Sequence, residues 1–534
     1  MITGSSPIGG GSPLSHRIAR VAARSRWAAL ALGGLAACGF EPLGLWSLTL
    51  VSLAGFLALL ARTVDVKQAA VLGWLFGLGH FVIGNNWIAT AFTYQANMPQ
   101  WLGWIAVVLL STYLAVYPML AALGAWAARR NPLAMALAFG GWWIVTEWLR
   151  SWVFTGYAWN PLAMVALGPF DRPGLAGVAP WMGTYALSGL VALAGGLLFW
   201  AIRQGRRAVV GICAFALIVV FQMPWPQPQT RPGSLAYTLV QPDVRQEVLD
   251  DPTQWEEQFQ RTAALSLPHP GMSRRIVLWP ESGVPDYLRD GYPEYLYVQT
   301  TFAGDPRAAR ARIGRVLGPG GLLMTGAVDL ELEGRNAVAA RNVITALDNT
   351  GAIRGGYAKA HLVPYGEYLP LRGILEPLGL SRLVPGALDF RPGPGPQTLD
   401  FGAWGKAGMQ ICYEIVFSGQ VTDRRHRPDY IFNPSNDGWF GSWGPPQHLA
   451  QARLRAIEEG LPVLRATTTG ISGVIDANGV VVRHIPRHVA ARVDGIVPAA
   501  RAPTAFARLG NLLALCWGAV LLGLSLVALR RWGG

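Results

Sequence analysis

The chain has 534 residues, of which 51% are hydrophobic and 14% are charged, and its formal net charge is +13. Soluble domains carry nearer to a quarter of charged residues, so this shortage argues against an ordinary soluble protein and indicates a membrane protein. Residues 231–505 contain 28 Lys and Arg against 27 Asp and Glu, so nearly all of the basic excess lies among hydrophobic segments. Basic residues between hydrophobic segments indicate how a membrane protein is oriented, so we do not expect a basic groove for nucleic acid.

The N-terminal segment, residues 1–26, is expected to be disordered and basic. Residues 1–16 are rich in Gly, Ser and Pro, and four arginines follow before the first apolar stretch. This pattern is superficially that of a signal peptide. Because further hydrophobic segments follow, we interpret the first apolar stretch as a retained helix.

Eight apolar stretches come next, and most are long enough to cross a hydrocarbon core of about 30 Å. They lie at roughly 27–40, 43–61, 68–92, 101–127, 132–149, 175–202, 208–225 and 509–529. We therefore expect a membrane α-helical bundle of about eight transmembrane helices. Seven of them belong to residues 27–225, and the last belongs to the C-terminal residues 509–534.

The short connections give an orientation. If the N-terminus is cytoplasmic, the basic connections all fall on the cytoplasmic side, as the positive-inside rule requires. These residues are Arg62, Lys67, Arg129, Arg130, Arg203, Arg206, Arg207, Arg530 and Arg531. The same alternation places residues 226–508 outside the cytoplasm. Glu147 and Arg150, three apart near an outer helix end, are expected to pair with each other rather than to contact head groups.

The pattern of expected strands and helices in residues 226–508 is that of one α/β domain, and the segment is long enough to form its own hydrophobic core. A Pro-rich linker at 224–228 opens this region. Short apolar runs predict strands, at Leu235–Val240, Ile276–Trp279, Leu322–Val328, Met409–Cys412 and Tyr430–Phe432. Helices are expected near Trp255–Leu265 and Gln447–Glu459, and Gly460 is a plausible stop for the second.

Cys412 is the only cysteine of this domain, since the others are Cys38, Cys213 and Cys516. No disulfide framework and no Cys/His zinc spacing is available, so no metal is expected. Thiolate is the reactive form of cysteine and needs a base or a positive neighbour at neutral pH. A lone cysteine is usually just a small buried hydrophobe, so its interpretation depends on partners elsewhere in the chain.

Two such partners are candidates. Glu281 follows an apolar run that Pro280 breaks, where a partly desolvated carboxylate can act as a general base. Lys359 is one of only three lysines in the chain and offers a compact charge to an oxyanion. Alone, each has an ordinary alternative, a solvated loop acid and a surface lysine. His361 is interpreted as a structural hydrogen-bonding residue.

The order Glu281, Lys359, Cys412 resembles the nitrilase superfamily, whose members use a Glu-Lys-Cys triad on an α-β-β-α sandwich. Four sequence motifs indicate a particular family within this superfamily. They are Trp-Pro-Glu-Ser, Lys-Ala-His-Leu-Val-Pro-Tyr-Gly-Glu-Tyr, Ile-Cys-Tyr-Glu-Ile and Ser-Asn-Asp-Gly-Trp-Phe-Gly. Attached to a multi-helix membrane region, they resemble the bacterial apolipoprotein N-acyltransferase family. The resemblance covers nearly the whole chain past residue 26 and implies a nitrilase-like fold for residues 226–508.

The resemblance implies that Cys412 is the nucleophile, Glu281 the general base and Lys359 the residue that stabilises the tetrahedral oxyanion. Glu367, in the Pro-Tyr-Gly-Glu word, would be a second carboxylate that supports Lys359 or the thiol.

Three further residues follow from the same resemblance. Tyr413 and Glu414 come directly after the nucleophile, and the main-chain N–H of Tyr413 is a candidate oxyanion donor. Trp255 matches a family tryptophan on a mobile arm near the lipid entrance. The chain departs from the expected pattern at Thr467–Gly470, where asparagine would precede the glycine, and at Asn433-Pro434 before Ser435. These departures affect the pocket wall more than the triad.

The implied activity moves an acyl chain from a phospholipid, phosphatidylethanolamine, through a cysteine thioester. The acceptor is the α-amino group of the N-terminal diacylglyceryl-cysteine of an apolipoprotein. The implied partners are the phospholipid donor, the lipoprotein acceptor and the membrane, with no cofactor. The implied location is the bacterial inner membrane, with the catalytic domain on the periplasmic side.

Two alternatives stay open at the level of sequence. A membrane-bound nitrilase-type amidase or hydrolase would use the same triad with water in place of the amine. A transporter with an outer binding module is the other, and the few intramembrane ionisable residues and the lack of a clear repeat of broken helices count against it.

Overall fold

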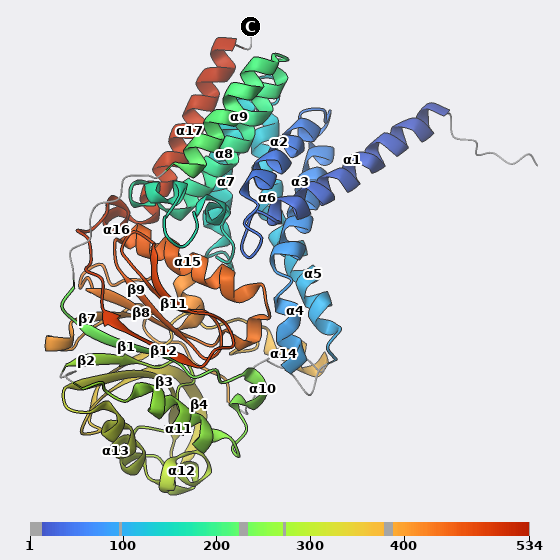
Figure 1. Cartoon of the computed structure of the whole chain (residues 1–534). Coiled ribbons are helices and arrows are strands. Elements are labelled where there is room, and N and C mark those ends of the chain that lie inside the picture. The colour runs from blue at the N-terminus through green and yellow to red at the C-terminus, as the bar shows by residue number, and fades with distance from the viewer. Residues whose placement is uncertain (1–12, 95–98, 224–232, 271–273, 379–387, 533–534) are drawn as a thin grey trace, which may run out of the picture.

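The computed structural model describes residues 13–94, 99–223, 233–270, 274–378 and 388–532. A bundle of long helices stands over an α/β domain of two sheets (Figure 1). The Pro-rich linker at 224–228 and the first twelve residues of the expected disordered segment lie outside the described residues.

The bundle is built from apolar helices, and polar side chains cap some of them. Asp65 caps one helix by accepting from the Gln68 N–H at 2.8 Å, and Asn131 caps another ahead of Pro132. The bounds are α1 Pro13–Ala37, α2 Trp46–Leu60, α3 Val66–Gly84, α4 Ile88–Ala91, α5 Leu102–Leu114, α6 Val116–Ala127, α7 Pro132–Arg150, α8 Gly183–Arg203, α9 Arg207–Gln222, α16 Ala505–Leu509 and α17 Asn511–Trp532. Every predicted apolar stretch therefore contains a helix.

Four spans of the described residues are long and apolar enough to cross a membrane. They are Val66–Gly84, Leu102–Ala127, Gly183–Arg203 and Asn511–Arg531, while α2 and α9 are apolar but shorter. This composition fits a membrane region.

The structure corrects three details of the predicted bundle. The helix α1 begins at Pro13, so residues 13–26 are helical where disorder was expected. The stretch at 175–202 is not one helix, because Leu175–Trp181 is a 3₁₀ turn that contains Pro180. The stretch at 101–127 is one span, Leu102–Ala127, but it divides into α5 and α6 near Pro118, which cannot donate to the Leu114 carbonyl.

Two six-stranded sheets form the α/β domain. The first has the order β12-β1-β2-β3-β4-β5 and the second has the order β11-β10-β9-β8-β7-β6. The pairs β1/β2, β2/β3, β7/β8 and β8/β9 are parallel, and the other neighbours are antiparallel. The bounds are β1 Ala236–Gln241, β2 Arg275–Leu278, β3 Gly321–Glu333, β4 Asn336–Asp348, β5 Ile353–Ala358, β6 Thr398–Asp400, β7 Lys406–Met409, β8 Tyr430–Ser435, β9 Val463–Thr467, β10 Ser472–Ile475, β11 Val481–Ile485 and β12 Ala491–Ile496.

The two sheets pack face to face with helices outside them. Ile276 and Met324 of the first sheet share one buried cluster with Phe432 and Leu464 of the second. Helix α13 (Pro306–Leu317) and Phe259 of α11 (Trp255–Ser266) pack on the outer face of the first sheet. Helix α15 (Gly444–Glu459) lies between the second sheet and the bundle (Figure 1). The expected α-β-β-α sandwich is confirmed.

Shorter helices fill the connections of this domain: α10 Gln246–Leu249, α12 Glu294–Thr300 and α14 Arg372–Leu375. The predicted strands and helices all occur, with one difference that matters for the site. The strand expected to reach Cys412 ends at Met409, and Cys412 instead opens the 3₁₀ helix η7, Cys412–Val416. As expected, α15 ends at Gly460, whose φ of 66° suits glycine.

Helix α15 also fastens the domain to the bundle. Its buried Arg453 donates to the carbonyl oxygens of Gly168, Pro169 and Arg172 at 2.8–2.9 Å, in the loop before α8. Its Glu458 accepts from the Thr184 N–H at the start of α8. These bonds hold the domain against one end of the bundle and thereby set where its site lies.

Candidate active site

Three loops bring the predicted acid, amine and thiol to one place. Glu281 lies three residues past β2, Lys359 directly follows β5, and Cys412 lies three residues past β7. Their exposed fractions are only 6%, 2% and 4%. The ordinary alternatives, a solvated loop acid and a surface lysine, are therefore wrong for Glu281 and Lys359.

Lys359 lies between two carboxylates. Its Nζ is 3.0 Å from Glu367 Oε1 and 3.3 Å from Glu281 Oε1. The amide of Asn342, on β4, donates to the same two oxygens at 3.0 Å and 2.7 Å. Glu281 Oε2 accepts from the main-chain N–H of Asn436 at 2.8 Å. Each of these buried polar side chains thus has hydrogen-bond partners, as burial demands.

The thiol of Cys412 lies close enough to the Glu281 carboxylate to lower the pKa of that carboxyl. Burial alone raises the pKa of a carboxyl, but Lys359, Asn342 and this thiol outweigh it and hold the pKa of Glu281 below its usual value. Burial, and then Glu281, raise the pKa of Cys412 well above its usual value, although Lys359 lowers it. At neutral pH the pair is therefore a thiol facing a carboxylate, which is the arrangement of a nucleophile and its general base.

The ammonium of Lys359 stays charged in this environment. Burial lowers the pKa of a lysine, but Glu281 and Glu367 outweigh it and raise the pKa above its usual value. A fixed positive charge beside the thiol can stabilise a negative oxygen that forms there.

Cys412 has an unusual backbone, with φ of +50°. Residues other than glycine rarely occupy this left-handed region, and when they do the residue is often at a functional site. The side chain is thereby presented at a sharp turn from strand to helix, as nucleophiles are in other hydrolytic folds.

Glu414 does not face the thiol. Its Oε1 accepts from the Tyr357 hydroxyl and the Ala360 N–H at 2.7 Å, and its Oε2 accepts from the Ile411 N–H at 2.7 Å. Burial raises its pKa to about 7, although these donors favour the ionised form. Glu414, which was predicted to support the site, thus connects the loops of Lys359 and Cys412 through buried hydrogen bonds.

The Tyr413 ring faces the membrane region. It lies parallel to Trp159, with ring centroids 6.4 Å apart, and edge-on to Phe417. Trp159 is fully buried, belongs to the loop after α7, and donates to Gln447 Oε1 of α15 at 2.9 Å. The aromatic contact therefore links the nucleophile's turn directly to the bundle.

Trp255, at the start of α11, lies apart from this group. Its indole N–H donates to the Leu249 carbonyl at 3.2 Å. Among the described residues, none of its recorded polar contacts reaches Glu281, Lys359 or Cys412. Its expected place on an arm at the lipid entrance remains a prediction.

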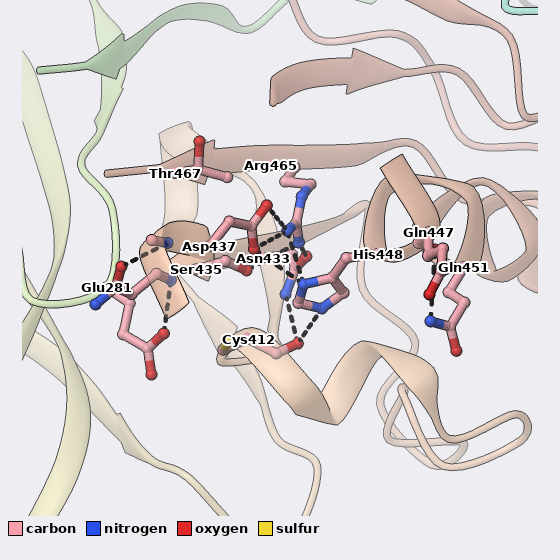
Figure 2. A network of polar contacts seen from close by, with 12 residues as sticks. Glu281, Cys412, Asn433, Ser435, Asp437, Gln447, His448, Gln451, Arg465 and Thr467 are labelled. Carbon is pink, nitrogen blue, oxygen red and sulfur yellow. Dashed lines mark hydrogen bonds and ion pairs between the residues drawn. The ribbon is translucent and has the colours of Figure 1, made fainter. Parts of the chain in front are cut away.

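A second polar cluster lies beside Cys412, and sequence reasoning missed it (Figure 2). It consists of Asn433, Asp437, His448 and Arg465, all fully or almost fully buried. The sequence did hold one indication of this cluster. Arg465 lies in the apolar run Val-Leu-Arg-Ala-Thr, and an arginine in a buried strand must have a polar partner. Asn342 carried no local signal.

The departures from the expected sequence pattern fall beside this cluster. Thr467 donates to Gln241 Oε1 at 2.9 Å, and the Thr468 hydroxyl donates to Asn436 Oδ1 at 2.8 Å. Asn436 is the residue whose N–H binds Glu281. Thr468 therefore supports the loop beneath the acid, whereas Thr467 and Thr469 bind Gln241 and Asp243. None of the three takes the place of Glu281, Lys359 or Cys412.

A thiol, a carboxylate and an ammonium buried together on a two-sheet sandwich define a nitrilase-like thiol enzyme, here joined to a bundle of apolar helices. Two family models match the chain accordingly. The model described as "Apolipoprotein N-acyltransferase N-terminal domain" matches residues 32–197, and "Carbon-nitrogen hydrolase" matches residues 246–490.

Curated relatives cover nearly the whole chain. An apolipoprotein N-acyltransferase of Rhodopseudomonas palustris is 31% identical over 523 residues, 94% of each chain. That of Bradyrhizobium diazoefficiens is 32% identical over 94% of each chain, and that of Sinorhizobium medicae 33% identical over 81% of this chain and 80% of its own. The chain belongs to the apolipoprotein N-acyltransferase family. A mutant of the Nesterenkonia AN1 amidase, from the nitrilase superfamily, is 18% identical, with a TM-score of 0.34 over 50% of this chain and 92% of its own.

Proposed function

We propose that this enzyme completes lipoprotein maturation with Cys412 as the carrier of the acyl chain. The donor is a membrane phospholipid, with phosphatidylethanolamine as the expected head group. The acceptor is the α-amino group of the diacylglyceryl-cysteine at the N-terminus of an apolipoprotein. The observation that carries this proposal is the burial of the Cys412 thiol beside the Glu281 carboxylate, with the Lys359 ammonium 3.3 Å from the same carboxylate.

The first half-reaction forms a thioester. Glu281 takes the thiol proton while the sulfur attacks the ester carbonyl of the phospholipid. Lys359 and the main-chain N–H of Tyr413 stabilise the oxyanion, and each such donor contributes about 3 kcal/mol. The ester C–O bond then breaks, Glu281 returns its proton to the leaving oxygen, and a lysophospholipid departs.

The second half-reaction releases the acyl chain to the lipoprotein. The α-amino group attacks the thioester carbonyl and passes a proton to Glu281. When the C–S bond breaks, Glu281 returns the proton to the sulfur, and the product is an amide. A covalent intermediate lets two membrane-anchored lipids use one site in turn. Glu367 holds Lys359 in place throughout, through the 3.0 Å contact between them.

The membrane arrangement is part of the proposal. We place seven crossings in residues 27–225, the catalytic domain in residues 226–508 and the eighth crossing in residues 509–534. The basic connections support a cytoplasmic N-terminus and a catalytic domain on the periplasmic face of the inner membrane. Exposing an acyl chain to water costs about 0.8 kcal/mol per CH₂, so a site against the outer leaflet avoids a large penalty.

The first test is the replacement Cys412→Ala, assayed with a phospholipid labelled in its acyl chain. Wild-type enzyme without acceptor should gain an acyl adduct that hydroxylamine removes, and intact-mass measurement should detect it. The variant should gain none. Cys516→Ala, at an exposed position of α17, is the matched control and should label like wild type.

Retention of a hydroxylamine-sensitive adduct by Cys412→Ala would contradict the proposal. With the lipoprotein acceptor added, the label should move to the acceptor. Release of free fatty acid as the main product would instead favour a hydrolase.

A further inference from the structure

The carbonyl oxygen of Cys412 is held by two buried side chains. The Nε2 atom of His448, on α15, lies 3.1 Å from it, and the Nδ2 atom of Asn433, on β8, lies 3.4 Å away. A carbonyl oxygen can only accept, so Nε2 carries the proton of the imidazole. Both residues are completely buried, and neither touches the thiol through a recorded contact among the described residues.

The opposite side of the imidazole is also fixed (Figure 2). His448 Nδ1 lies 2.9 Å from a guanidinium nitrogen of Arg465 and 3.0 Å from Asp437 Oδ1. The same Arg465 nitrogen donates to both carboxylate oxygens of Asp437 at 2.7 Å and 2.8 Å. Arg465 also donates to Asn433 Oδ1, so the arginine orients both side chains that hold the Cys412 carbonyl.

Asp437 and Arg465 act on the sulfur in opposite directions, because Asp437 raises the pKa of the Cys412 thiol and Arg465 lowers it. Burial and Arg465 lower the pKa of His448 against the effect of Asp437, so the imidazole is neutral near pH 7. Besides these opposed charges, the cluster imposes a geometry on the site through the Cys412 carbonyl that it holds.

That geometry concerns the peptide between Cys412 and Tyr413. A peptide unit is planar and trans, so its C=O and N–H point in opposite directions. Fixing the carbonyl of Cys412 on one side therefore fixes where the N–H of Tyr413 points on the other. Tyr413 is the second residue of η7, and among the described residues no oxygen accepts from its N–H. This is the N–H that the proposed mechanism uses for the oxyanion.

We propose that His448 is a positioning residue for the oxyanion hole: by donating from Nε2 to the Cys412 carbonyl, it aims the Tyr413 N–H at the acyl oxygen. This inference rests on the proposed role of Cys412. It assigns to α15, the helix that holds the domain against the bundle, an indirect part in transition-state stabilisation, through the peptide that it positions.

The test compares two amide replacements. In His448→Gln the amide nitrogen can occupy the place of Nε2, whereas in His448→Asn it can occupy only the place of Nδ1. Both keep a polar group in the cluster. Gln451→Ala, one helical turn further along α15 and equally buried, is the control.

Two reactions of Cys412 distinguish a loss of the Tyr413 N–H orientation from a general disturbance of the site. Acyl-enzyme formation from a labelled phospholipid passes through an oxyanion, whereas alkylation by iodoacetamide does not. Removing one oxyanion donor lowers rates by about 10²–10³-fold. We therefore expect His448→Asn to lose about 100-fold in acylation while its alkylation rate stays within threefold of wild type. His448→Gln should keep acylation within tenfold, and Gln451→Ala should match wild type.

Three results would overturn the inference: wild-type acylation in His448→Asn, an equal fall of acylation and alkylation in that variant, or equal acylation losses in the Gln and Asn variants. None of them touches the role of Cys412. Failure of that role would appear separately, as a hydroxylamine-sensitive adduct in Cys412→Ala.

Discussion

The hydroxyl of Tyr357 donates to Glu414 Oε1 over 2.7 Å, and this bond joins the first sheet to the 3₁₀ helix η7, which Cys412 opens after the second sheet's strand β7. The same carboxylate accepts from the N–H of Ala360, next to Lys359, and from the N–H of Ile411, next to Cys412. One buried acid thus sets the spacing between the two loops that carry the amine and the thiol.

Replacing Glu414 by Gln should therefore loosen both loops. At pH 8, where Glu414 is ionised, its two oxygens accept from four donors. An amide nitrogen cannot accept, so at least one buried donor loses its partner, at a cost of about 1–3 kcal/mol. We expect a lower melting temperature and at least a tenfold fall in acyl-enzyme formation, measured on the full chain in detergent.

Glu257→Gln is the control, because Glu257 is exposed on α11 and, within the described part of the chain, pairs only with Arg261 at 2.9 Å. Its effect on stability should stay within about 0.5 kcal/mol. Wild-type melting and acylation by Glu414→Gln would show that Glu414 has no such role.

Replacing Lys359 by Met should change the pH dependence of acylation. Lys359 is the largest influence that holds the pKa of Glu281 down against burial. Without it, burial dominates and the pKa of Glu281 rises, so the base is protonated over a wider range of pH. The acidic limb of the pH–rate profile should move to higher pH, and acylation at pH 7 should fall at least 100-fold because an oxyanion donor is also lost.

Lys406→Met is the matched control, since Lys406 is an exposed lysine at the start of β7. Single-turnover acylation from pH 5 to pH 10 measures both profiles. An unmoved acidic limb in Lys359→Met would contradict the assignment of Glu281 as the base that Lys359 keeps ionised.

Asp437 should stabilise the fold above pH 4. Burial would raise its pKa, but Arg465, together with His448 once acid protonates that imidazole, outweighs burial and lowers the pKa from 3.8 to about 2. A lowered carboxyl pKa gives stability that is present above pH 3.8 and is lost as the pH falls through 2. The shift corresponds to about 2 kcal/mol. Asp437→Asn lacks this contribution and also leaves the Arg465 charge without its partner.

The measurement is the melting temperature of wild type and Asp437→Asn between pH 7 and pH 2. The gap between them should be widest near neutral pH and should narrow below pH 4. Asp400→Asn, at an exposed strand end, should track wild type throughout. A gap that widens on acidification would show that the ionised carboxylate does not stabilise the fold.

Much of the domain could be predicted from local patterns, because its strands are short apolar runs and because Glu281, Lys359 and Cys412 lie in distinctive sequence motifs. The turn at Cys412 could not, since an apolar run continues smoothly through Ile411 and nothing in it encodes a φ of +50°. Asn342 stands on β4, 61 residues from the Glu281 that it binds, and only the sheet pairing brings the two together.

In the helical region, too, local patterns predicted the elements but not their irregularities. The apolar stretches showed where helices occur, but they did not show where those helices are interrupted. Gly183 has a φ of +77°, and a side chain there would overlap the Phe506 ring from the far end of the chain. The start of α8 is thus fixed by a contact across more than 300 residues, which no local pattern contains.

Glu147 and Arg150 confirm the expected pairing, at 3.6 Å and with both side chains buried. Arg150 also donates to the Trp159 carbonyl at 2.8 Å, and Glu147 accepts from the Leu162 N–H at 2.9 Å. The pair therefore holds the loop whose Trp159 lies against Tyr413. Arg150→Met should leave the carboxylate buried without its cation, at a cost of about 3 kcal/mol, and should lower acylation through Trp159.

The double variant Glu147→Gln with Arg150→Met tests whether the charge or the loop contact matters. If the stranded carboxylate causes the loss of stability, the double variant should melt well above Arg150→Met, because removing both charges of a buried pair costs far less than removing one. Acylation should stay low in both variants, since neither can donate to the Trp159 carbonyl. Recovery of acylation together with stability would instead assign the whole effect to the buried charge and none to the position of Trp159.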